Sequence, residues 1–136
     1  MKMLIDKNKK LNTIQNEFEK IFPFLKIEFY KRAHSQGEGS AKKNTLDVEL
    51  TIGEVQKKNA SGTIEIHKLM TVAELESAFT EVFGLAVQVF RKSGKVWLQT
   101  TTTDDWTLAE QDQRASEKVA TAEENIIDSM DRQELE

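Results

Sequence analysis

The sequence predicts an α+β fold, a ferredoxin-like β-α-β-β-α-β domain followed by an acidic tail. Residues 3–31 and 64–92 align without a gap at an offset of 61, and apolar positions of one segment meet apolar positions of the other. Each segment has the pattern of a strand, an amphipathic helix and a second strand. We therefore expect two helices on one face of an antiparallel sheet, with a ubiquitin-like roll or another α+β sandwich as the alternative.

The first segment carries a local signal for each element. Met3 to Ile5 is a short apolar run that predicts a strand. An apolar stripe at helical spacing follows from Leu11, and Pro23 ends the helix because it disfavours helical backbone at the preceding residue. Apolar and polar residues then alternate over 25–30, which predicts a strand with one buried face.

The connection between the segments should be a loop and one short helix. Residues 34–45 have no apolar period and contain two glycines, which is typical of a loop. Leu46, Val48 and Leu50 alternate, so a short extended stretch is expected. Thr51 and Glu54 form a capping box, which predicts a helix over about 52–58.

The second segment has stronger end signals. After a strand over 63–67, Thr71 and Glu74 form another capping box, and Gly84 provides a left-handed helix end. The extra C-terminal strand then forms a hairpin with a turn at Ser93-Gly94.

The faces of this hairpin can be assigned in two ways. The gapless repeat buries Gln88 and Phe90, whereas hairpin pairing groups four aliphatic residues on one face. We favour the aliphatic face as the buried one, which places Phe90 and Trp97 opposite each other on the other face. The aliphatic residues are Val87, Val89, Val96 and Leu98.

Charge divides the chain into a body and a tail. Residues 1–103 carry 16 Lys and Arg against 12 Asp and Glu, whereas 104–136 carry 3 against 11. We therefore predict a single α+β domain over 1–106 and an acidic, partly helical tail over 107–136. Thr107 and Glu110 form a third capping box, so a helix should begin at Leu108.

The composition excludes several function classes. The chain has no cysteine, so disulfides, thiolate catalysis and Cys-ligated metal sites are excluded. We find no Walker loop, GxGxxG or nucleophile elbow, and Glu65 with His67 lacks an evident third metal ligand. We expect a cytoplasmic, soluble, non-enzymatic protein without a cofactor, a metal or a membrane partner.

The hairpin carries the most specific surface feature of the sequence. Phe90 and Trp97 flank three basic residues near the turn, and an outward aromatic of the earlier strand, Tyr30, adds to the same face. A hairpin that is apolar on both sides favours a protein-interaction module, whose partner is another protein or a second copy of the chain. Single-stranded nucleic acid binding through Phe90, Trp97 and the basic turn is the alternative, although the RNP1 pattern is absent. The candidate surface comprises Tyr30, Phe90, Arg91, Lys92, Lys95, Trp97 and Trp106.

Two stretches of the chain carry a resemblance. MTVAELESAFTEVFGL and VQVFRKSGKVWLQTTTTDDWTL resemble a group of small uncharacterised bacterial proteins, over about residues 61–110. The resemblance implies a stand-alone bacterial domain with a variable extension after about residue 113. It implies no activity and no functional residue.

Overall fold

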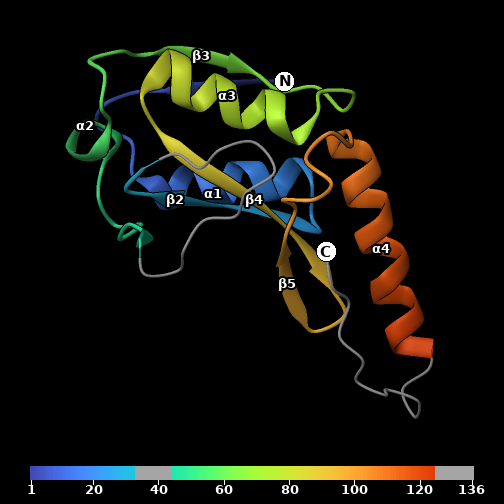
Figure 1. Ribbon diagram of the computed structural model, residues 1–136. Helices are drawn as coiled ribbons and strands as arrows, with labels where there is room; N and C mark the ends of the chain where they lie inside the picture. Colours follow the sequence, from blue (N-terminus) through green and yellow to red (C-terminus); the bar gives the residue numbers. More distant parts are fainter. Residues whose placement is uncertain (33–43, 125–136) are drawn as a thin grey trace.

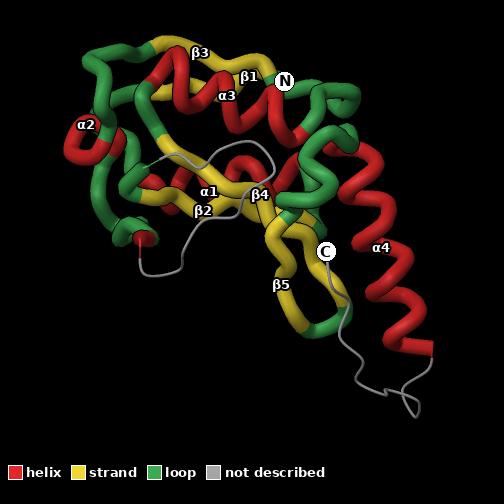
Figure 2. The backbone as a smooth tube through the Cα atoms, in the orientation of Figure 1, coloured by secondary structure: helices red, strands yellow, loops and turns green. Residues whose placement is uncertain are grey.

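A computed structural model describes residues 1–32 and 44–124, with side chains to Glu117. Most of the predicted loop over 34–45 and the end of the predicted tail, 125–136, lie outside the described residues. Figures 1 and 2 show helices and strands in one α+β arrangement, as the sequence predicts. The elements in chain order are β1 Lys2–Ile5, α1 Leu11–Ile21, β2 Leu25–Tyr30, α2 Ile52–Val55, β3 Gly62–Glu65, α3 Val72–Phe83, β4 Ala86–Ser93, β5 Val96–Gln99 and α4 Leu108–Glu124.

The strands form two antiparallel sheets. β1 pairs with β3, and the second sheet has the order β2-β4-β5. This corrects the ferredoxin-like expectation, in which β2 and β4 are opposite edges of one sheet. In the structure β4 pairs with β2 along one edge and with β5 over Phe90–Ser93 of the other, and β1 pairs with β3 instead. Residues 44–46 pair with the end of β2, where the Leu46 amide donates to Phe29 O at 2.9 Å.

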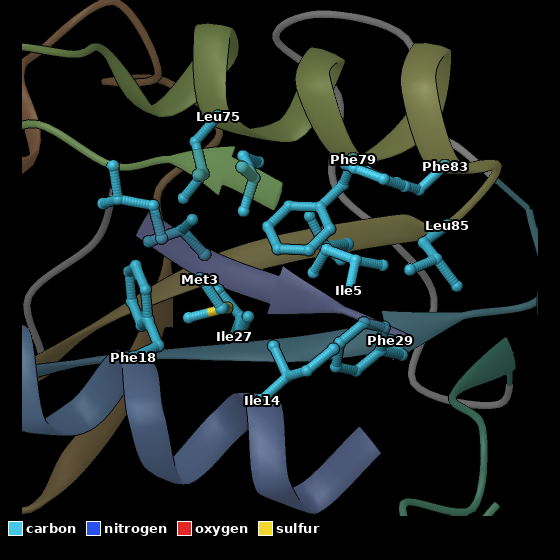
Figure 3. Packing of buried hydrophobic residues seen from close by; sticks show 14 of the residues in the cluster. Met3, Ile5, Ile14, Phe18, Ile27, Phe29, Leu75, Phe79, Phe83 and Leu85 are labelled. Atoms are coloured by element: carbon cyan, nitrogen blue, oxygen red, sulfur yellow. The ribbon is translucent and has the colours of Figure 1, made fainter. Parts of the chain in front are cut away.

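The core lies where α1, α3 and the inner faces of the two sheets meet. Figure 3 shows Phe18 and Ile14 of α1 and Phe79 of α3 pointing into the same apolar cluster. Phe79 meets Phe29 of β2 edge to face, with ring centres 6.4 Å apart. Such pairs add specific ring geometry to the burial of apolar surface.

The helix ends follow the capping signals of the sequence. The Thr71 hydroxyl accepts from the Glu74 amide at 3.1 Å, and the Glu74 carboxylate accepts from the Thr71 amide at 2.8 Å. Gly84 ends α3 in the left-handed region, with φ of 67°. A second box at Thr107 and Glu110 begins α4 at Leu108.

The two halves of the chain repeat the same backbone contacts around these helix starts. The residue before α1 bridges the residue before α2, and the residue before α3 bridges the residue before α4 in the same way. In each case, backbone amides and carbonyls of the two helix starts bond reciprocally. The bonds are Leu11 N to Leu50 O and Ile52 N to Lys9 O in one half, and Val72 N to Trp106 O and Leu108 N to Met70 O in the other.

The offset of 61 holds for the start of β4 but not for its apolar core positions. β4 starts at Ala86, which is 61 residues after Leu25, but the residues in the core are Leu25, Ile27 and Phe29 in β2 and Val87 and Val89 in β4. The burial of Val87 and Val89 confirms the hairpin-based assignment for these two residues. The assignment is wrong for Val96, which is 45% exposed because the tip of the hairpin extends beyond the core (Figure 1).

α4 packs against the second sheet. Leu108 and Ala115 are fully buried, and the Phe24 amide at the start of β2 donates to Asp112 Oδ1 at 3.1 Å. The first part of the predicted acidic tail is therefore a packed helix.

Candidate interaction surface

The seven candidate residues do not lie on one face of the sheet. Cross-strand partners share a face of the sheet. The register therefore places Lys92 and Trp97 together on one face, and Arg91 and Leu98 together on the other. Lys95 lies in the exposed turn and Trp106 precedes α4. Tyr30, Phe90, Lys92 and Trp97 share the outer face, whereas Arg91 belongs to the inner face.

The turn of the hairpin differs from the expected one. Ser93 pairs with Val96 as the last rung of the ladder, so the loop is Gly94-Lys95 rather than Ser93-Gly94. Gly94 has φ of 60°, a conformation that glycine adopts without a steric penalty. Phe90 therefore pairs with Gln99, and it is a diagonal neighbour of Trp97 rather than its direct partner.

Two aromatic rings and two lysines form a layer on the outer face, which we call the aromatic–lysine layer. Lys26 Nζ lies 5.3 Å from the ring centre of Phe90 and 4.9 Å from that of Trp97. Lys92 Nζ lies 5.1 Å from the Trp97 ring. Each such contact at a partly exposed site contributes about 0.5–1 kcal/mol. The ring faces are therefore in contact with cations of the same chain.

Arg91 holds α4 against the sheet and is 4% exposed. Its Nη1 donates to Gln111 Oε1 at 2.8 Å, and its guanidinium carbon lies 5.5 Å from the Trp106 ring centre. Gln111 Nε2 in turn donates to Thr103 O at 2.8 Å. Sequence reasoning missed Gln111 because a polar residue on a helix of the acidic tail gives no signal of burial.

Tyr30 is also buried, at 3% exposure. Burial raises the pKa of its phenol to about 12, and the negative charges of Glu28 and Glu76 act in the same direction. The neighbouring strand has Gln88 fully buried, with no hydrogen-bond partner for Oε1 among the described residues. Tyr30 and Gln88 thus belong to the interior, although their positions in the strands face outward.

The two edges of the three-stranded sheet differ. The edge of β2 is occupied, because Gln15 Nε2 donates to Ile27 O at 2.8 Å and residues 44–46 pair with its end. At the edge of β5 the backbone groups point differently. The Lys92 amide donates to Phe24 O, toward β2, so Lys92 and Trp97 form a pair without hydrogen bonds between their backbones. The amide and carbonyl of Trp97 therefore point away from β4, to an edge of β5 that pairs with no strand of residues 1–32 and 44–124 and that we call the open edge.

The sequence raised His67, together with Glu65, as a possible metal ligand. His67 is exposed, and within residues 1–32 and 44–124 no three His, Asp or Glu side chains gather as a metal site. Over the same residues, every helix is too short or too polar to cross a bilayer.

Comparison with known proteins gives no relative. No family model matches the chain, and no match is found among curated proteins or solved structures.

Proposed function

We propose that this chain is a non-enzymatic protein-interaction module that acts through the open edge of β5, and that its partner is a second copy of the chain. The observation that carries the proposal is the difference between the two sheet edges. Gln15 and residues 44–46 occupy the edge of β2, whereas Trp97 directs its backbone groups outward from β5. In the dimer, two β5 strands pair antiparallel about a twofold axis and make one continuous sheet.

The side chains of β5 support this pairing. Val96 is 45% exposed, and Trp97 and Leu98 are partly exposed. Proteins commonly protect free edges with proline, bulges or inward charges. β5 is short, at four residues, but its sequence Val-Trp-Leu-Gln contains no proline and no charged residue, and its register with β4 has no bulge.

Sedimentation velocity over micromolar to millimolar concentrations tests the proposal. We expect the unaltered chain to approach a dimer with rising concentration, and Val96→Lys and Trp97→Lys to remain monomeric. Leu4→Lys is the matched control, because Leu4 is an exposed aliphatic residue of a strand in the other sheet. A monomer at every concentration, or equal loss in the Leu4 variant, would contradict the proposal.

The second candidate function is single-stranded nucleic acid binding by the aromatic–lysine layer and the basic turn. The position of Lys26 and Lys92 next to two rings favours it, because such surfaces stack bases and neutralise phosphates. It ranks second because a base must displace lysines that already contact the rings.

Fluorescence anisotropy with labelled oligonucleotides tests this second candidate. Binding should fall steeply with salt, and Phe90→Ala or Trp97→Ala should each cost about 1–3 kcal/mol. Salt-insensitive binding, or no binding, would exclude it.

A further inference from the structure

A cleft of about 230 Å³ lies at the end of the second sheet away from the hairpin. It opens where β2 ends and β4 begins, beside α2 and the C-terminal end of α3. Its floor is apolar and is made by Phe29, Leu46, Val55 and Leu85. Phe29 and Leu85 also belong to the core, so the cleft is backed by packed side chains.

The rim of the cleft is basic. Four cationic side chains surround the floor, and the described lining residues include no carboxylate. Among the described residues, Lys58 Nζ contacts the Glu81 carbonyl, whereas the side chains of Lys31, Arg32 and Lys57 make no hydrogen bond or ion pair. Like charges around a low-dielectric floor reinforce one another and attract anions.

Gly84 allows the segment with Lys57 and Lys58 to lie close to the end of α3, on the same cleft as Lys31 and Arg32. Its carbonyl accepts from the Lys57 amide at 2.9 Å. A Cβ at this position would lie 2.5 Å from the Lys58 amide nitrogen, so only glycine permits this approach. The segment after α2 is thereby held beside Lys31 and Arg32 at the end of β2.

We infer that this cleft binds a small amphipathic carboxylate, an anion with an aliphatic body of the size of octanoate. A free inorganic anion would leave the floor in contact with water, and a neutral apolar ligand would leave the cations uncompensated. The volume equals that of roughly eight liquid waters, at about 30 Å³ each, which suits a short chain rather than a nucleotide. This site lies away from β5, so the inference is independent of the proposed dimer.

Isothermal titration and NMR chemical-shift mapping of the full chain test the inference, with octanoate as the probe. 1-Octanol and inorganic phosphate are the matched ligands, since each has only one half of the recognised chemistry. We expect octanoate to bind, to shift the amides of the cleft residues, and to bind more weakly as salt increases.

Charge-removing variants locate the site. Arg32→Gln and Lys57→Gln should each weaken octanoate binding about two- to fivefold, the range expected for one partly exposed ion pair. Lys20→Gln is the control, because Lys20 is an exposed lysine of α1 outside the cleft. Circular dichroism checks that each variant is folded.

Three results would overturn the inference. These are equal binding of 1-octanol, equal binding of phosphate, and absence of octanoate binding or of any effect of the two cleft variants. If the sedimentation experiment shows only a monomer, octanoate binding to the cleft is still expected. Failure of one proposal is therefore distinguishable from failure of the other.

Discussion

At the scale of single residues, we expect large contributions to stability from two residues of α3, one buried in the core and one that caps the helix. Phe79 is fully buried and contacts Phe29 across the core, whereas Thr71 fixes the start of the same helix from its surface. These two residues act by different mechanisms, since one fills volume and the other satisfies a backbone amide.

We expect Phe79→Ala to lower the free energy of unfolding by about 3–5 kcal/mol through the lost burial and the cavity it leaves. Thr71→Ala should cost about 1 kcal/mol through loss of the cap. Urea denaturation gives both values, with Ser77→Ala as the control because Ser77 is exposed on the same helix. A Phe79 variant as stable as the unaltered chain would contradict the core assignment.

At the scale of elements, α4 is tied to the sheet by polar contacts from two strands. Asp112 accepts from the Phe24 amide before β2, and Gln111 accepts from Arg91 of β4. Burial raises the pKa of the Asp112 carboxyl, and the hydrogen bond from Phe24 acts in the opposite direction.

The raised pKa determines the sign of a pH effect. The stability contribution of such a carboxyl is complete below its unfolded pKa and is lost as the pH rises through its folded pKa. We therefore expect Asp112→Asn, which keeps an acceptor without the charge, to be at least as stable as the unaltered chain at neutral pH. Asp112→Ala should lose about 1 kcal/mol with the hydrogen bond.

Chemical denaturation at pH 3 and pH 7 measures these differences. The advantage of Asp112→Asn should shrink toward acid pH, where the unaltered carboxyl is protonated. A growing advantage at pH 3 would show that burial of Asp112 is not the dominant influence.

At the scale of the whole molecule, the final helix belongs to the same packed body as the two halves that precede it. Leu108 lies in the apolar cluster, and its amide bonds to Met70 O at 2.8 Å. The segment with an excess of negative charge, which begins near residue 104, thus starts as a structural element.

Deletion of residues 107–136 should destabilise the body by more than about 2 kcal/mol, the lower end for loss of one buried leucine side chain. It should also increase binding of an apolar dye, since the inner side of β4 near Arg91 loses its cover. We expect no affinity for single-stranded RNA or DNA in either form, measured by anisotropy at two salt concentrations. Salt-sensitive binding that appears on truncation would instead favour the nucleic-acid function.

Much of the local structure could be predicted because its signals lie in consecutive residues. The capping boxes at Thr71 and Thr107 and the glycine at 84 locate the ends of α3 and the start of α4. The candidate surface was less predictable. Arg91 follows Phe90 directly in an apolar hairpin, and only the position of α4 makes it a buried contact of Gln111.

The sequence by itself determined the α+β class, the starts of three capped helices and the burial of Val87 and Val89, because propensity and alternation act over a few residues. The tertiary structure decided which strand edges were available. Gln15 and residues 44–46 occupy the outer edge of β2, whereas no other strand in the part of the chain that the structure describes pairs with the outer edge of β5. Strand pairing depends on such competition for backbone hydrogen bonds, which no local pattern records.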